Sequence, residues 1–325
     1  MPKKYYLCGM MKRMILLAGL LLGAVTAVAQ QADSWAVVNT SACFLRLKPD
    51  YESGNETQCL MGTVLRIHGA ERYWRLADAP DYKNVWTTER NIAVMDEAGK
   101  DAWIAAPKYI CVVEYTHLFA APDKDAPRLC DFTMADLVRQ GTKCRRGWVQ
   151  VFLPDGREAW VRSREVMDFD AWVKGRQATE EALLSTARRF LGTPYMWGGA
   201  SIKGFDCSGF TQFVYRQSGI VLPRNAREQI YTGEAVPYDF DQMRPGDLLF
   251  YGTPATPEKP MVVAHVAMYY GDRKIIHSSM VVRISSLTPD GEDFYDRKPL
   301  AVRRILGHVD DGSGIRSMMA RPWYY

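Results

Sequence analysis

Hydrophobic and polar residues alternate in short runs over the first half of the chain, from about residue 33 onward. Runs of this kind at 43–48, 64–67 and 148–151 are separated by turn-forming residues, which is typical of β-strands. Two regions, 33–100 and 105–168, repeat the pattern without a convincing helix, and we expect each to fold as a small all-β barrel. Four tryptophans are expected to lie in the barrel cores rather than to stack on a ligand: Trp74, Trp86, Trp148 and Trp160.

The pattern changes after the second of these regions. Residues 169–178 are expected to form a linker, followed by a helix over 179–191 that Thr179 caps. A second helix is expected to begin at Cys207, because apolar residues recur after it at helical spacing. Together with the strands that follow, these helices predict an α+β domain over 179–325.

Two antiparallel strands are expected late in the chain. His265 precedes an alternating apolar run at 266–270, a Gly-Asp turn follows, and a returning strand begins at Lys274. Adjacent strands of this kind can hold His265 and His277 on the same face of the sheet. The Pro- and Thr-rich insert Gly252–Pro260 is expected to be a surface loop that shapes access to a cleft.

The pattern of the N-terminal segment is typical of an export signal. Lys12 and Arg13 precede an apolar run at 15–28, and small residues surround a cleavage point at 27–29. The apolar run is too short to span a membrane. We therefore expect residues 1–29 to be a cleaved signal peptide and the mature protein to be periplasmic or extracellular, without stable membrane insertion.

Net charge gives no argument for a nucleic-acid partner. The formal net charge is +4, and the expected signal peptide contains four basic residues and no acidic ones: Lys3, Lys4, Lys12 and Arg13. The mature chain is then formally neutral, so its charge does not favour binding to a polyanion.

Six cysteines lie beyond the expected signal peptide. If Cys207 is a free nucleophile, an odd number remains and not all of them can pair. Cys43–Cys59 and Cys130–Cys144 are possible bridges, and the pairing stays open among five residues: Cys43, Cys59, Cys111, Cys130 and Cys144.

Cys207 is the candidate nucleophile of the chain. A thiol at a helix N-terminus faces the positive end of the helix dipole, which favours the reactive thiolate. His265 is expected to act as the base and His277 to orient it, while the Cys207 backbone N–H meets the oxyanion. The alternatives are a buried structural cysteine, or a zinc site formed by these three residues, which lacks the usual ligand spacing. We expect no metal and no cofactor.

Four motifs in sequence order resemble those of one family. They are Tyr195-x-Trp197-Gly198-Gly199 followed by Asp206-Cys207-Ser208-Gly209, then Arg244-Pro245-Gly246-Asp247, Ala264-His265-Val266-Ala267 and Ile275-Ile276-His277-Ser278. This series resembles the NlpC/p60 family of papain-like cysteine peptidases of bacterial cell walls. The two β-rich regions resemble bacterial SH3-like domains, the second more clearly. The resemblance implies a papain-like α+β catalytic domain preceded by two small all-β SH3-like barrels.

The resemblance also implies roles for individual residues. Tyr195 would assist the oxyanion and Trp197 would contact substrate. Asp206 and Ser208 would surround a free substrate amine, with an acidic residue and a tyrosine from the first barrel, for which Glu56 and Tyr82 are the candidates. The usual acid position is Gly54 here, and the tyrosine motif departs by one residue. Arg224 matches a basic residue near the D-Glu carboxylate.

Family members with this domain order are γ-D-glutamyl–diamino acid endopeptidases of the dipeptidyl-peptidase VI type. The implied substrate is a peptidoglycan stem peptide or muropeptide, cut between D-Glu and meso-diaminopimelate or Lys, and we expect the enzyme to be a monomer. Three other hypotheses stay open. The chain is a wall lysin that acts on glycan-linked stems, a papain-fold amidase or acyltransferase on another substrate, or a binding module that has lost catalysis.

Overall fold

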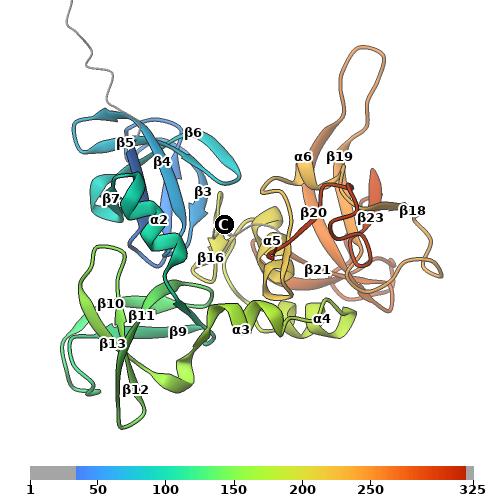
Figure 1. Cartoon of the computed structure of the whole chain (residues 1–325). Coiled ribbons are helices and arrows are strands. Elements are labelled where there is room, and N and C mark those ends of the chain that lie inside the picture. The colour runs from blue at the N-terminus through green and yellow to red at the C-terminus, as the bar shows by residue number, and fades with distance from the viewer. Residues whose placement is uncertain (1–33, 320–325) are drawn as a thin grey trace, which may run out of the picture. The chain divides into compact units, whose positions relative to one another are not determined.

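The computed structural model describes residues 34–319, in which strands predominate and helices are a minority (Figure 1). The expected signal peptide lies outside the described residues. Among the residues described, no helix combines the length and the apolar character that crossing a membrane requires.

The first β-rich region forms a seven-stranded antiparallel sheet in the order β3-β2-β6-β5-β4-β1-β7. Its strands follow the predicted alternation; in β2, for example, Cys43 and Leu45 point into the core while their neighbours are half-buried. The strand bounds are β1 Ser34–Val38, β2 Cys43–Arg46, β3 Asn55–Cys59, β4 Val64–Glu71, β5 Trp74–Ala79, β6 Tyr82–Thr88 and β7 Ile92–Met95.

The second region repeats this arrangement with the strand order β10-β9-β13-β12-β11-β8-β14. As expected for barrel cores, Trp74, Trp148 and Trp160 are buried, whereas Trp86 is only partly so. The strand bounds are β8 Lys108–Cys111, β9 Tyr115–Phe119, β10 Arg128–Thr133, β11 Leu137–Arg145, β12 Trp148–Phe152, β13 Glu158–Arg162 and β14 Val166–Asp168.

Two short helices occupy segments for which the sequence predicted none. Helix α2 (Glu97–Ala105) connects the two sheets, and Asp96 caps it by accepting a hydrogen bond from Gly99 N. Helix α3 (Phe169–Lys174) lies in the expected linker, and Asp168 caps it by accepting from Ala171 N. Both helices begin with a side-chain cap, the kind of signal that the sequence analysis used only at Thr179.

The third region combines helices with a six-stranded antiparallel sheet in the order β18-β23-β19-β20-β21-β22. Thr179 caps α4 as predicted, but this helix ends at Arg188 rather than at Leu191. The helix bounds are α4 Glu180–Arg188, α5 Cys207–Gln217 and α6 Ala226–Gln229. The sheet strands are β18 Glu234–Val236, β19 Leu248–Thr253, β20 Val262–Gly271, β21 Lys274–Ser279, β22 Val281–Ser286 and β23 Ala301–Arg304. Short strands β15 Ala200–Ser201, β16 Gly204–Phe205, β17 Ile220–Val221 and β24 Arg316–Ser317 form two further pairs.

One hydrophobic cluster joins all three regions. It combines Leu60 of the first region and Leu137 of the second with Phe205, Phe210 and Phe213 around α5. Packing of this kind fixes the regions against each other, since interiors are close-packed and resist relative movement. The first and second regions are thereby held against α5.

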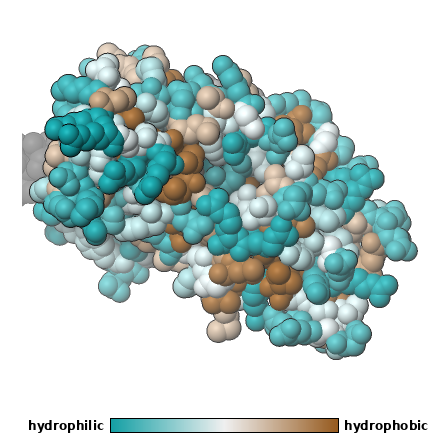
Figure 2. Space-filling view, turned by 90° about the horizontal axis from the view of Figure 1, so that it is seen from below, coloured by the Kyte–Doolittle hydropathy of each residue, from teal (hydrophilic) through white to brown (hydrophobic). Residues whose placement is uncertain are grey.

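Fifteen large hydrophobic side chains are exposed within residues 34–319. On the face drawn in Figure 2, hydrophobic residues form small groups surrounded by hydrophilic surface. The expected insert Gly252–Pro260 is exposed, but its first two residues extend β19, so the loop between β19 and β20 begins after Thr253 (Figure 1). Trp197 is 69% exposed although the three residues that follow it are buried.

A buried carboxylate connects the two seven-stranded sheets. Asp136 is fully buried and accepts hydrogen bonds from Met61 N at 3.0 Å, Thr133 N at 2.7 Å and Thr133 Oγ1 at 2.9 Å. Removal of this acceptor leaves buried backbone donors without partners.

We therefore expect Asp136→Ala to lower the free energy of unfolding by about 3 kcal/mol, measured by urea denaturation. Asp125→Ala is the matched control, because Asp125 is exposed and pairs only with the exposed Lys124. Equal stabilities of the two variants would contradict the structural role of Asp136.

Candidate active site

Cys207 is the first residue of α5, as the sequence predicted, and its side chain is 8% exposed. Asp206 caps the helix by accepting a hydrogen bond from Gly209 N at 2.7 Å. A side chain at Gly209 is excluded, because its Cβ would lie 2.0 Å from the Gly199 carbonyl oxygen. The glycine thus lets the loop before the helix pack directly against its first turn.

His265 and His277 lie on neighbouring strands β20 and β21 and face each other, as expected. The distance from His265 Nε2 to His277 Nδ1 is 2.8 Å. The turn between the strands has Asp272 and Arg273 at positive φ, which is typical of a tight hairpin. Helix α5, which begins with Cys207, packs against both strands of this pair, and the Val266 backbone N–H, adjacent to His265, acts to lower the pKa of the Cys207 thiol.

Burial governs the protonation of these three groups. It lowers the pKa of His265 to about 4, with smaller contributions from Arg297 and Arg283. Burial, and then His265, lowers the pKa of His277 to about 3. Burial, and then Asp206, raises the pKa of Cys207 to about 11, although the Val266 and Ser208 backbone donors act in the opposite direction.

The direction for Cys207 is opposite to the one predicted from the helix terminus. Loss of water around the sulfur outweighs the helix N-terminus, because desolvation disfavours the charged form. At neutral pH the resting site therefore holds a neutral thiol beside two neutral imidazoles, and the proton transfer accompanies attack on a substrate.

A cleft of about 220 Å³ opens in front of Cys207. Seven residues singled out from the sequence line it: Glu56, Tyr82, Tyr195, Trp197, Asp206, Cys207 and Ser208. Burial, and then Cys207 and Asp206, raises the pKa of Tyr195 to about 12, so its hydroxyl is a neutral donor beside the thiol. Five further lining residues were not named as site candidates: Asn225, Ala226, Arg227, Val263 and Ala264.

Glu56 reaches the cleft through a β-bulge in the first sheet. Thr57 pairs with Leu45 and Asn55 with Arg46, which leaves Glu56 as the extra residue on β3. Bulges redirect a side chain out of the regular alternation and occur often beside active sites. The Tyr82 hydroxyl donates to Glu56 Oε2 at 2.8 Å, so the two candidates from the first sheet form a pair.

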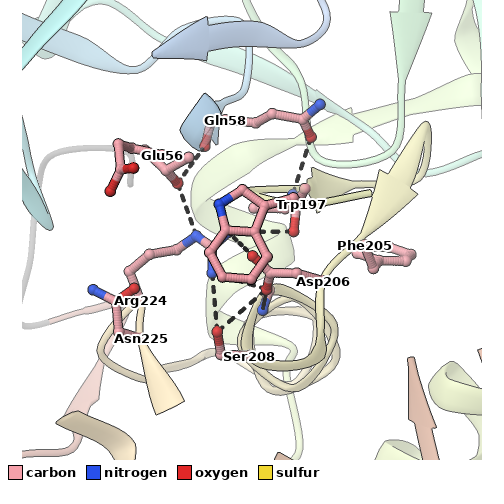
Figure 3. Close-up of polar contacts among 12 residues, drawn as sticks. Glu56, Gln58, Trp197, Phe205, Asp206, Ser208, Arg224 and Asn225 are labelled. Carbon is pink, nitrogen blue, oxygen red and sulfur yellow. Dashed lines mark hydrogen bonds and ion pairs between the residues drawn. The ribbon is translucent and has the colours of Figure 1, made fainter. Parts of the chain in front are cut away.

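Arg224 lies behind the cleft rather than in it. Its buried guanidinium forms an ion pair with Asp206, with Nη2 2.6 Å from Asp206 Oδ2, and Nε donates to Thr57 Oγ1 at 2.8 Å. Figure 3 shows Arg224 between the strand that carries Glu56 and Gln58 and the helix start that carries Asp206 and Ser208. The predicted contact with a D-Glu carboxylate stays a prediction, and it would have to replace part of this ion pair.

Neighbours of Glu56 on β3 bind the loop that precedes Cys207. Gln58 Oε1 accepts hydrogen bonds from Ala200 N at 3.0 Å and Ser201 Oγ at 2.9 Å, and Asn55 Nδ2 donates to the Trp197 carbonyl at 3.0 Å. The first sheet therefore forms one wall of the cleft and also supports its floor.

The remaining histidines make local contacts away from Cys207. His68 contacts Asp78 at 3.2 Å, His308 contacts Asp311 at 2.9 Å, and His117 packs edge-on against Tyr115. Within residues 34–319 no group of three or more His, Cys, Asp or Glu side chains is arranged to hold a metal ion. Cys43 and Cys59 lie directly opposite each other on β2 and β3, and the six cysteines in this part of the chain are free thiols.

Comparison with known proteins gives two matching families. Residues 192–303 match the model of the NlpC/P60 family, and residues 112–168 match that of the bacterial SH3 domain. A computed superposition on the crystal structure of an NlpC/P60 family protein from Bacillus cereus has a TM-score of 0.68 at 24% identity, covering 83% of this chain and 99% of that one. That likeness shows the fold.

Two curated relatives have peptidase names. The chain is 36% identical over 157 residues to a γ-D-glutamyl-L-lysine dipeptidyl-peptidase of Bacillus cereus, covering 48% of this chain and 46% of that protein. It is 25% identical over 258 residues to dipeptidyl-peptidase 6 of Lysinibacillus sphaericus, covering 75% and 88%. The match thus spans about half the length of the Bacillus relative.

The raised pKa of Cys207 predicts how its alkylation depends on pH. A thiol with a pKa of about 11 is mostly protonated at neutral pH, so its thiolate fraction grows about tenfold per pH unit below that value. We expect the rate of iodoacetamide reaction at Cys207, followed by mass spectrometry, to rise steadily from pH 6 to pH 9. Cys207→Ser controls for the other thiols. A rate that is constant over this range would mean that a thiolate–imidazolium pair already exists.

Proposed function

Because this chain belongs to the NlpC/P60 family over residues 192–303 and carries a bacterial SH3 domain over residues 112–168, we propose that it is an exported cysteine endopeptidase of peptidoglycan stem peptides. It hydrolyses the bond between γ-D-Glu and the diamino acid, meso-diaminopimelate or Lys, and releases L-Ala-γ-D-Glu. The names of the two dipeptidyl-peptidase relatives support this choice of bond.

The observation that carries the proposal is the hydrogen bond of 2.8 Å between His265 and His277 beside a buried cysteine at a helix N-terminus. Cys207 lines the cleft, and the two histidines lie on strands that pack against the helix that begins with Cys207, which is the arrangement that a nucleophile, its base and an orienting group require. Within the proposal, the NlpC/P60 region has a papain-like arrangement, and residues 33–100 form a second SH3-like barrel. The proposed enzyme acts as a monomer.

The chemistry begins with a neutral thiol. Cys207 Sγ attacks the γ-carbonyl carbon of D-Glu while its proton passes to His265, and the C–S bond forms. The developing oxyanion lies within reach of the Cys207 backbone N–H and the neutral Tyr195 hydroxyl. His265 then gives the proton to the amine of the diamino acid as the C–N bond breaks, and water hydrolyses the thioester.

The end of the cleft that the first sheet forms selects substrates with a free N-terminal amine. Glu56 accepts a hydrogen bond from Tyr82 and lines the same cleft as Cys207, so an acidic group is present although the usual position is Gly54. A carboxylate there stabilises the ammonium of L-Ala and disfavours an acylated amine. Asp206 is already paired with Arg224, so Glu56 carries more of this selection than Asp206 does.

One observation favours a second candidate function. A Cβ on Gly54, two residues before the cleft residue Glu56, would meet no atom within 4 Å, so there is open space beside the strand that carries Glu56. Open space there suits a stem peptide that is still attached to its muramyl sugar. The second candidate is therefore a lysin of glycan-linked stems, with the same bond cleaved.

Product analysis tests the function directly. We expect purified mature protein to cleave free L-Ala-γ-D-Glu-diaminopimelate and to release a dipeptide that ends in D-Glu, detected by mass spectrometry. Cys207→Ala should bind the peptide without hydrolysing it. Preferred cleavage of the muramyl-linked stem would select the lysin, whereas different products would select an amidase, and no hydrolysis by wild type would select a binding module.

Glu56→Gln tests the selection of the amine. We expect kcat/KM for the free tripeptide to fall about tenfold to a hundredfold, because a hydrogen bond to a charged group is lost. Activity on the N-acetylated tripeptide should be unchanged. Glu52→Gln is the matched control, since Glu52 is an exposed acid near the same strand. An equal loss of kcat/KM on both tripeptides would show that Glu56 does not recognise the free amine.

A further inference from the structure

The loop between β22 and β23, residues 287–300, places side chains beside the histidine pair, although none of the sequence motifs lies in this loop. The loop folds back on β22, with Tyr295 N donating to the Ser286 carbonyl at 2.9 Å and Ser286 N donating to the Glu292 carbonyl at 3.2 Å. This return brings Asp293 beside the end of β22 and sets the Tyr295 ring against His265 and His277, with centroid distances of 5.8 and 5.1 Å.

A continuous row of hydrogen bonds runs from this loop to the base. The Ser285 hydroxyl donates to Asp293 Oδ2 at 2.7 Å, and Ser285 Oγ lies 3.0 Å from His277 Nε2. His277 Nδ1 lies 2.8 Å from His265 Nε2. His277 is fully buried and Ser285 is 1% exposed, so water does not compete along the central part of this row.

The number of protons in this row permits one arrangement. A hydroxyl has a single proton, and a carboxylate only accepts, so the Ser285 proton is committed to Asp293. Ser285 Oγ must then accept from His277 Nε2–H. A neutral imidazole has one N–H, so His277 Nδ1 is a bare acceptor, and His265 Nε2–H donates to it. His265 Nδ1 is left without a proton.

We infer that Asp293 and Ser285 are positioning residues that fix the tautomers of both histidines, so that His265 offers the lone pair of Nδ1 to the Cys207 thiol. Burial lowers the pKa of both imidazoles and keeps them neutral. A neutral ring has one N–H, which can be on either nitrogen, whereas a doubly protonated ring has no choice of tautomer. This inference rests on the proposed function only for its catalytic consequence.

During the reaction only one proton moves. His265 Nδ1 accepts the thiol proton as the C–S bond forms and later donates it to the leaving amine nitrogen. His265 Nε2–H, His277 Nε2–H and the Ser285 hydroxyl proton keep their places. With the opposite tautomers, His265 Nδ1 would already carry a proton and the thiol proton would have no acceptor.

The experiment reads the tautomers without using activity. The chain has five histidines, so ¹⁵N NMR of histidine-labelled protein can resolve His265 and His277 at neutral pH. We expect a protonated Nε2 and a bare Nδ1 on both in the wild type. Ser285→Ala and Asp293→Ala should change these populations or mix them, while Asp296→Asn, an exposed acid of the same loop, should not.

Kinetics then measure the catalytic consequence. We expect Ser285→Ala and Asp293→Ala to lower kcat on the cleaved stem peptide about tenfold to a hundredfold with little change in KM, because the cleft is untouched. Ser285→Thr, which keeps the hydroxyl, should restore most of the rate. Circular dichroism and urea unfolding identify any variant that fails to fold.

Two results would overturn the inference: a protonated Nδ1 on His277 in the wild type, or unchanged tautomers with kcat within twofold of wild type in both alanine variants. If the wild type cleaves no stem peptide, the proposed function fails, but the tautomers are still read by NMR. The two failures are therefore distinguishable.

Discussion

The buried ion pair between Asp206 and Arg224 holds the site together. Arg224 Nη2 lies 2.6 Å from Asp206 Oδ2, and the same guanidinium donates to Thr57 Oγ1 of the first sheet and to Ser208 Oγ in α5. Asp206 in turn caps the helix that begins with Cys207. Loss of one partner would leave a buried charge, which costs about 3–5 kcal/mol, so the first sheet and the nucleophile are coupled through this pair.

Much of the fold could be predicted from the alternation of the sequence. The β-rich character of the two N-terminal regions, the cap at Thr179, the helix at Cys207 and the histidine hairpin are all present in the structure. Each depends on local spacing or on a local cap, which a single sequence displays. Helices α2 and α3 were not predicted, because both are short and lie beside regions in which the alternating pattern predicted only strands.

The candidate residues of the site could be named from the sequence, but their physical state could not. The sequence pointed to Cys207, His265 and His277, but burial reverses the direction expected for the pKa of the thiol, and burial is a property of the whole fold. The bulge that aims Glu56 depends on the register of β3 against β2. The contact of Asp293 with Ser285 depends on a loop that returns to β22, and its residues carry no periodic signal.

The anchoring of β3 separates two properties of the protein. Thr57 and Gln58 fix the strand to Arg224 and to the loop before Cys207, while the bulged residue between Asn55 and Thr57 projects into the cleft without helping to hold it. Under the proposed function, a change at this one position would alter what the cleft accepts, while the neighbouring contacts would keep the reactive groups in place. Substrate selection and chemistry would then depend on different parts of the chain, so the first could diverge in descendants of this protein without a change in the second.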